Sequence, residues 1–192
     1  MRIIRRNKVS VWFTGSMFLY IGFLVLFLPL RWIIAIVISS LIHELFHILA
    51  AYLLGFHINS VRIGIGGAVI ETPEMSAKRE LCCALAGPLG GLCLLLFKKW
   101  LPVTAVCAAF QSLYNLIPIY PLDGGRILQC CTKIMFSTKT AHHVSVIIEH
   151  IFITCIALLG IYGTFVVHLG ALPLIVTICL ILSAKKNTLQ SR

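Results

Sequence analysis

The chain has 192 residues, of which 59% are hydrophobic and 11% are charged, and its mean hydropathy is +1.00. Soluble globular domains carry roughly a quarter of their residues as charged side chains, so this composition excludes that class. The formal net charge of +10 fits the basic loops of a membrane protein, and we expect no nucleic acid as a partner. We predict one integral-membrane domain over residues 1–192.

Apolar segments long enough to cross a hydrocarbon core of roughly 30 Å recur along the whole chain. The first follows a basic N-terminus and resembles a signal peptide, but its length and the lack of a small-residue cleavage site predict an uncleaved span. The fold class is therefore an all-α polytopic membrane protein with about six transmembrane helices, expected at residues 9–30, 32–55, 81–97, 101–117, 143–167 and 172–184.

Three stretches between or within these spans break the helical pattern. Residues 58–71 are rich in β-branched residues and glycine and predict a small β-hairpin after the second span. Its edge could accept a substrate strand, or the hairpin could simply connect spans at the membrane surface. Pro88 predicts a kink or break in the third span. Residues 118–140 predict a broken, re-entrant loop after the fourth span, with a basic, partly amphipathic piece over 126–139.

The distribution of basic residues predicts the orientation in the membrane. With six spans, 13 of the 16 Lys and Arg residues fall on the side that holds both termini. Because basic residues collect on the cytosolic side, we expect a multi-pass protein of the cell membrane with both termini in the cytosol. The eight cysteines show no spaced metal-binding or disulfide framework and are interpreted as small buried hydrophobic residues.

The second predicted span contains the sequence His-Glu-x-x-His, with His43, Glu44 and His47. On a helix the two histidines share one face and can hold one zinc ion. Glu44 lies next to that face, where it can take a proton from the attacking water. A charged side chain in a span is costly and marks a functional site by default. The alternative interpretation is a polar contact between helices.

Two histidines leave a zinc site without its third protein ligand, and Asp123 is the best candidate for it. A straight fourth helix would carry Asp123 to the membrane boundary, far from His43. Pro118 and Pro121 end that helix, and Gly124 with Gly125 gives the backbone freedom to fold back. The alternative third ligand is Glu149, because another class of membrane zinc proteases uses a glutamate after the His-Glu-x-x-His sequence.

These motifs together resemble the site-2 protease family of intramembrane zinc metalloproteases. The resemblance rests on HELFH at 43–47, the glycines at 66–67, AGP at 86–88 and N-x-x-P-x-x-P-L-D-G-G at 115–125, and covers roughly residues 30–130. The layout looks most like the branch that processes sporulation pro-sigma factors. The resemblance implies His43, His47 and Asp123 as zinc ligands and Glu44 as catalytic base.

By the same resemblance, Asn115 is a catalytic polar group near the scissile bond, where it could orient the substrate or stabilise the oxyanion. The sequence departs from the family at Phe46, where the family usually has glycine, and at Gly91, where asparagine is common. The regulatory domains that accompany the protease in several branches are not expected here.

The predicted function is that of an intramembrane zinc endopeptidase that acts in the lipid bilayer. Its partner is a membrane protein substrate, cut within or next to the membrane, and a regulatory membrane partner or an oligomer is left open. The alternative is a non-hydrolytic metal-binding membrane protein, such as a transporter or an inactive scaffold. Glu44 separates the two, because only the protease needs a base beside the water.

Overall fold

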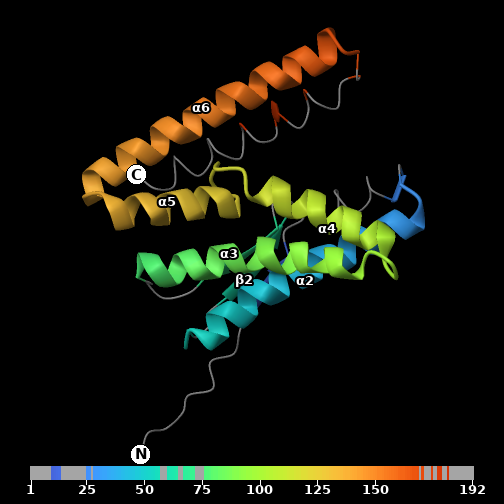
Figure 1. Cartoon of the computed structure of the whole chain (residues 1–192), viewed down its shortest axis with the longest axis horizontal. Coiled ribbons are helices and arrows are strands. Elements are labelled where there is room, and N and C mark those ends of the chain that lie inside the picture. Colours follow the sequence, from blue (N-terminus) through green and yellow to red (C-terminus); the bar gives the residue numbers. More distant parts are fainter. Residues whose placement is uncertain are drawn as a thin grey trace, which may run out of the picture. The chain divides into compact units, whose positions relative to one another are not determined.

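The computed structural model describes residues 10–13, 25–26, 28–56, 60–64, 67–71 and 76–168, together with residues 170, 174, 177–178 and 181. The chain divides into two compact units, Met1–Tyr114 and Asn115–Arg192. Figure 1 shows the helices and strands of both units in the colours of the sequence. The His-Glu-x-x-His sequence belongs to the first unit, and Asp123 belongs to the second.

The first unit contains a three-stranded sheet in the order β1, β2, β3. β2 (Ser60–Gly64) and β3 (Gly67–Glu71) pair antiparallel, with Gly64 opposite Gly67 at the closed end. Both strands lie within residues 58–71, the stretch for which the sequence predicts a hairpin. β1 (Ser10–Phe13) pairs with β2 in parallel.

β1 corrects the predicted start of the first membrane span. The apolar run from residue 9 suggests a helix, but Ser10–Phe13 form a strand. Valine, tryptophan and phenylalanine favour strands as well as lipid. The pairing with β2 along one edge of β1 is a long-range contact that hydropathy alone cannot predict. Residues 14–24 of the predicted span lie outside the described residues.

Three helices complete the described part of the first unit. They are α2 (Leu30–Leu53), α3 (Ala77–Cys93), which continues into the short 3-10 helix η1 (Leu94–Phe97), and α4 (Pro102–Asn115). α2 and α3 pack along each other (Figure 1). α2 buries one residue in every four, so that a single narrow stripe faces its neighbours: Ala35, Ser39, His43, His47 and Ala51.

Pro88 lies inside α3 and does not interrupt it. Proline removes one backbone hydrogen bond and usually kinks or ends a helix, and the sequence predicts a kink or a break here. The structure has no break, because α3 continues for five residues after Pro88. Small residues also lie on the buried face of α3, among them Ala84 and Gly91.

The second unit is built from an irregular segment, residues 116–122, followed by α5 (Asp123–Met135) and α6 (Thr138–Phe165). The side-chain oxygens of Thr132 on α5 and Ser145 on α6 lie 2.7 Å apart in a buried hydrogen bond. The predicted loop over 118–140 is thus wrong for residues 123–135, which form a helix. The amphipathic pattern noted for 126–139 has its physical reason here, since α5 buries Cys130 and Thr132.

Three helices of the described part of the chain are long and apolar enough to cross a membrane. They are α2, α3 with η1, and α6. Together with the composition, they identify an integral membrane protein. α4 matches the position of the predicted fourth span, but its 14 residues extend only about 21 Å at 1.5 Å per residue. Most of the predicted sixth span lies outside the described residues.

Candidate metal centre

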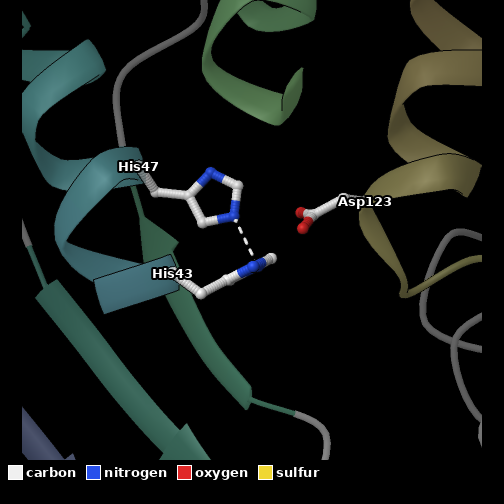
Figure 2. Close-up of side chains that lie close together, drawn as sticks. All are labelled: His43, His47 and Asp123. Atoms are coloured by element: carbon white, nitrogen blue, oxygen red, sulfur yellow. Dashed lines mark hydrogen bonds between the residues drawn. The ribbon is translucent and has the colours of Figure 1, made fainter. Parts of the chain in front are cut away.

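His43 and His47 lie one turn apart on the buried stripe of α2, with 2% and 7% of their surfaces exposed. Their Nε2 atoms are 3.2 Å apart, and their ring centroids lie 4.8 Å apart with the planes at 79°. Figure 2 shows the two rings turned so that these nitrogens meet. The four-residue spacing places both histidines on one helix face, and the burial removes competing water.

α3 fixes the orientation of the His47 ring. Nδ1 of His47 lies 2.7 Å from the backbone carbonyl oxygen of Cys83. A carbonyl oxygen only accepts hydrogen bonds, so Nδ1 carries the proton and donates it. In the neutral imidazole, Nε2 is then the nitrogen that carries the lone pair. A metal-binding histidine commonly has its other nitrogen held in this way, which fixes both the tautomer and the direction of the ring.

Gly87 on α3 leaves the space into which the two imidazoles point. A Cβ atom at this position would lie 2.2 Å from Nε2 of His47 and 2.7 Å from Nε2 of His43. No real side chain can approach so closely, so residue 87 must be glycine for the rings to keep these positions. The missing Cβ keeps a small volume open next to both nitrogens.

The donor geometry of the two rings fits a zinc ion. Two nitrogens about 2.0–2.1 Å from one tetrahedral zinc ion are separated by about 3.3 Å, and the observed separation of the Nε2 atoms is 3.2 Å. A hydrogen bond between the two Nε2 atoms requires the proton on His43 Nε2, because Nε2 of His47 carries the lone pair. A cation in place of that proton would be held by both rings, with no change of rotamer required by this distance.

Phe46 is accommodated by Gly90, one turn further along α3. A Cβ at position 90 would lie 2.2 Å from Cγ of Phe46 and 2.7 Å from its Cβ. The aromatic ring that departs from the glycine usual in the site-2 protease family thus packs against a position that has no side chain. Glu44, between His43 and Phe46 in the same turn of α2, is partly buried.

A polar contact joins α2 to α4 one turn before His43. The Gln111 side-chain oxygen accepts a hydrogen bond from the Ser39 hydroxyl at 2.7 Å, and its nitrogen donates to the Ser40 hydroxyl at 3.2 Å. Hydrogen bonds between membrane helices contribute roughly 0.6–2 kcal/mol each. These contacts hold the part of α2 that leads into the His-Glu-x-x-His sequence.

In the second unit, Asp123 is the first residue of α5 and only 8% exposed. The segment before it folds tightly over the first turn of this helix. A Cβ at Gly124 would lie 2.2 Å from the carbonyl oxygen of Leu116, and one at Gly125 would lie 2.5 Å from the backbone nitrogen of Tyr120. The two glycines are therefore required by close backbone packing that sets the position of Asp123.

Two further candidate site residues, Asn115 and Glu149, come before and after this segment in the sequence. Asn115 is the last residue of α4 in sequence and is partly buried. Glu149 lies on α6, and its carboxylate accepts a hydrogen bond of 3.0 Å from the backbone N–H of Tyr120. One oxygen of Glu149 is therefore used by the polypeptide backbone.

Within the described part of the chain, His43, His47 and Asp123 form a set of three buried residues that could hold a metal ion. Figure 2 draws these three side chains. They offer two imidazole nitrogens and one carboxylate oxygen, which is the donor set expected of a catalytic zinc site. Glu149 is not a member of the set.

The sequence predicted the residues that would bind the metal ion. It did not predict the residues that keep those ligands in position. Gly87 was noted only as part of the AGP motif, and no pattern paired it with the histidines or paired Gly90 with Phe46. The Cys83 carbonyl belongs to the backbone and leaves no trace in the sequence. Gln111 was not singled out, and Glu149 was considered only as an alternative ligand; their hydrogen-bond partners lie 72 and 29 residues away in the sequence.

No protein-family model matches the sequence, and comparison with curated proteins gives no match. Among solved structures, the fold is similar to that of the site-2 protease from Methanocaldococcus jannaschii, with a TM-score of 0.68 and 20% sequence identity. The alignment covers 97% of this chain and 94% of that chain. The likeness extends over nearly the whole of both chains and shows a common fold.

Proposed function

We propose that the protein is an intramembrane zinc endopeptidase of the site-2 protease type. His43, His47 and Asp123 are the zinc ligands in this proposal. The observation that carries it is the arrangement of His43 and His47, whose Nε2 atoms converge at 3.2 Å in the space that Gly87 leaves open. The fold similarity to a site-2 protease and the apolar helices support it.

Each residue of the proposed site has a distinct task. A bound zinc ion supplies Lewis-acid chemistry, polarising water or a carbonyl oxygen. Glu44 takes the proton of the water that attacks the peptide carbonyl carbon, and then gives it to the leaving amine as the C–N bond breaks. Asn115 orients the substrate or stabilises the oxyanion through its amide N–H groups. Burial of the histidines strengthens all of these electrostatic contributions.

The proposed substrate is a protein segment within or next to the membrane. A helical segment must unwind before cleavage, because its carbonyl groups are hydrogen-bonded in the helix. β3 is an edge strand of the described sheet, so an extended substrate could pair with it. Processing of a sporulation pro-sigma factor is the narrower form of this proposal and rests on the predicted six-span layout alone.

The proposal also covers the arrangement in the membrane and the partners. It includes a single domain with about six spans, both termini in the cytosol, and residues 116–122 as the re-entrant break after the fourth span. The basic loops and the apolar helices are its support. A regulatory membrane partner or an oligomer would act on this same domain.

The test compares zinc content and cleavage in the purified full chain. Glu44→Gln should retain stoichiometric zinc and lose cleavage of a membrane-segment reporter by at least about 1,000-fold, because the general base is removed. His43→Ala and Asp123→Ala should lose both zinc and cleavage. Glu80→Gln, which changes an acidic residue in the first turn of α3, is the matched control and should change neither.

Three outcomes would change the assignment. Normal cleavage by Glu44→Gln contradicts the mechanism. The wild type could bind zinc through the three ligands and still cleave no membrane segment. In that case a non-hydrolytic metal-binding membrane protein becomes the better description. Zinc retained after Asp123→Ala identifies another third ligand, with Glu149 the first to examine.

A further inference from the structure

The segment that leads to Asp123 has few backbone N–H groups that can form hydrogen bonds. Among residues 118–122, Pro118 and Pro121 have no N–H group, which leaves three donors. Ile119 donates to the carbonyl of Ile117 at 2.8 Å, and Leu122 donates to that of Ile119 at 2.9 Å. Both bonds are local turns and fix only the path from one residue to the next.

Tyr120 supplies the third donor, and its acceptor comes from a different element. Its backbone N–H donates to Oε1 of Glu149 at 3.0 Å, across 29 residues of chain and within the same unit. Glu149 lies in the middle of α6, a helix long and apolar enough to span the membrane. An acidic residue is costly in such a helix and calls for a functional reason.

We propose that Glu149 is a positioning residue for the metal site, which anchors the backbone of Tyr120 to α6 and thereby fixes Asp123. The inference rests on the proposed function, because it concerns the third ligand of the proposed zinc site. It assigns Glu149 a role through Asp123 and not as a ligand. The carboxylate contributes as a hydrogen-bond acceptor for the polypeptide.

Close packing transmits the position of Tyr120 to Asp123. The Tyr120 nitrogen lies where a Cβ at Gly125 would approach within 2.5 Å, so it rests directly on the first turn of α5. Leu122 accepts hydrogen bonds from the N–H groups of Gly125 and Arg126 at 3.0 and 3.2 Å. The anchored residue and the first turn of α5 therefore move together, and Asp123 is the first residue of that turn.

The loss of the Glu149 acceptor has a defined effect on the site. The Tyr120 N–H would lose its acceptor on α6, so residues 119–122 would no longer be held to that helix and would carry Asp123 with them as they shift. Residues that orient metal ligands from behind usually change metal affinity by about 10–100-fold when removed. We expect Glu149→Ala to weaken zinc binding within that range and to lower cleavage accordingly.

The decisive comparison is between Glu149→Ala and Glu149→Gln in the full chain. Zinc affinity is measured by competition with a chelator, and the ligand field is observed in the absorption spectrum of the Co²⁺-loaded protein. Glutamine keeps the acceptor oxygen, so Glu149→Gln should bind zinc within about 3-fold of wild type and keep the Co²⁺ spectrum. Glu149→Ala should bind about 10–100-fold more weakly, with a broadened or shifted spectrum.

A backbone change tests the same bond without altering Glu149. Replacing the Tyr120 amide N–H by an ester oxygen, through incorporation of the matching α-hydroxy acid, removes the donor and keeps every side chain. This protein should match Glu149→Ala in zinc affinity. Combining both changes should weaken zinc no further, because the two act on one hydrogen bond. This test stays informative if Glu149→Ala does not fold.

The controls separate failure of this inference from failure of the proposed function. Wild type without stoichiometric zinc that depends on His43 overturns the proposed function. If wild type binds zinc and Glu149→Ala binds it equally well, only the positioning role is overturned. Equal loss in Glu149→Ala and Glu149→Gln also overturns it and makes Glu149 a ligand. His150→Ala, a polar neighbour bonded to its own helix at Val146, should behave as wild type.

Discussion

The two histidines and Asp123 are positioned by different physical means. In the first unit, His43 and His47 are held by the regular geometry of α2, since a spacing of four residues places them on one face. α3 then adds a hydrogen bond to His47 and a glycine at 87 that leaves the rings their space. This half of the candidate centre depends on helix-to-helix packing.

In the second unit, Asp123 is held by an irregular backbone. Residues 116–122 pack their carbonyl and amide groups on Gly124 and Gly125, and Glu149 holds the Tyr120 N–H. No helix period places this aspartate. The two histidines are placed by one helix and need only a neighbouring helix that packs closely against them. Asp123 follows an irregular segment and needs several specific backbone contacts to keep its position.

The largest effect is expected from filling the space beside the histidines. Gly87→Ala puts a methyl group 2.2 Å from Nε2 of His47, so one of the rings must leave its position. We expect zinc affinity to fall by on the order of 100-fold or more and cleavage to fall with it. Zinc titration and a reporter cleavage assay measure both.

Gly90→Ala is the matched control for that change, because it adds the same methyl group to α3 against Phe46 rather than against the histidines. It should retain zinc binding far better than Gly87→Ala. Equal zinc affinity for Gly87→Ala and wild type would contradict the role given to the glycine.

A smaller effect on zinc is expected from the backbone packing of the second unit. Gly124→Ala brings a methyl group within 2.2 Å of the Leu116 carbonyl oxygen, so the backbone must separate and Asp123 must move. The expected loss of zinc affinity is about 10-fold, measured by chelator competition. Gln129→Ala, on the same helix, should leave affinity unchanged, and an unaffected Gly124→Ala would show that Asp123 does not depend on this packing.

The contact of Phe46 with Gly90 should affect the free energy of unfolding more than the zinc affinity. Gly90→Ala should lower the free energy of unfolding by about 1–3 kcal/mol, as overpacking usually does. In the Phe46→Ala background the same change should cost much less, because the ring that it would strike is gone. A double-mutant cycle by denaturant titration in detergent measures the coupling, and a coupling near zero would argue against this contact.

The smallest effect concerns the buried hydrogen bond between α5 and α6. Thr132→Val and Ser145→Ala each remove one partner of the 2.7 Å contact. Each should destabilise the protein by roughly 0.6–2 kcal/mol, the same range as for the contact between α2 and α4, with no change in zinc affinity. Unfolding curves of both single variants and the double variant check this, and additive losses would show that the two side chains do not interact.

The sequence was sufficient for the features that depend on local spacing. Hydropathy located α2, α3 and α6 to within a few residues, because the requirement to span a bilayer is a property of one segment. The four-residue interval of His43 and His47 predicted their common face, because helix geometry is the same in every protein. The prolines at 118 and 121 likewise predicted the end of α4, because proline cannot continue its hydrogen bonding.

Only the tertiary structure decided which distant groups meet. Cys83 lies 36 residues from His47, Gln111 lies 72 residues from Ser39, and Glu149 lies 29 residues from Tyr120. The strand at 10–13 likewise pairs with residues 60–63, about 50 residues further along the chain. Such contacts depend on how separate elements pack, and a polar or small residue in a sequence carries no record of the backbone group that will lie against it.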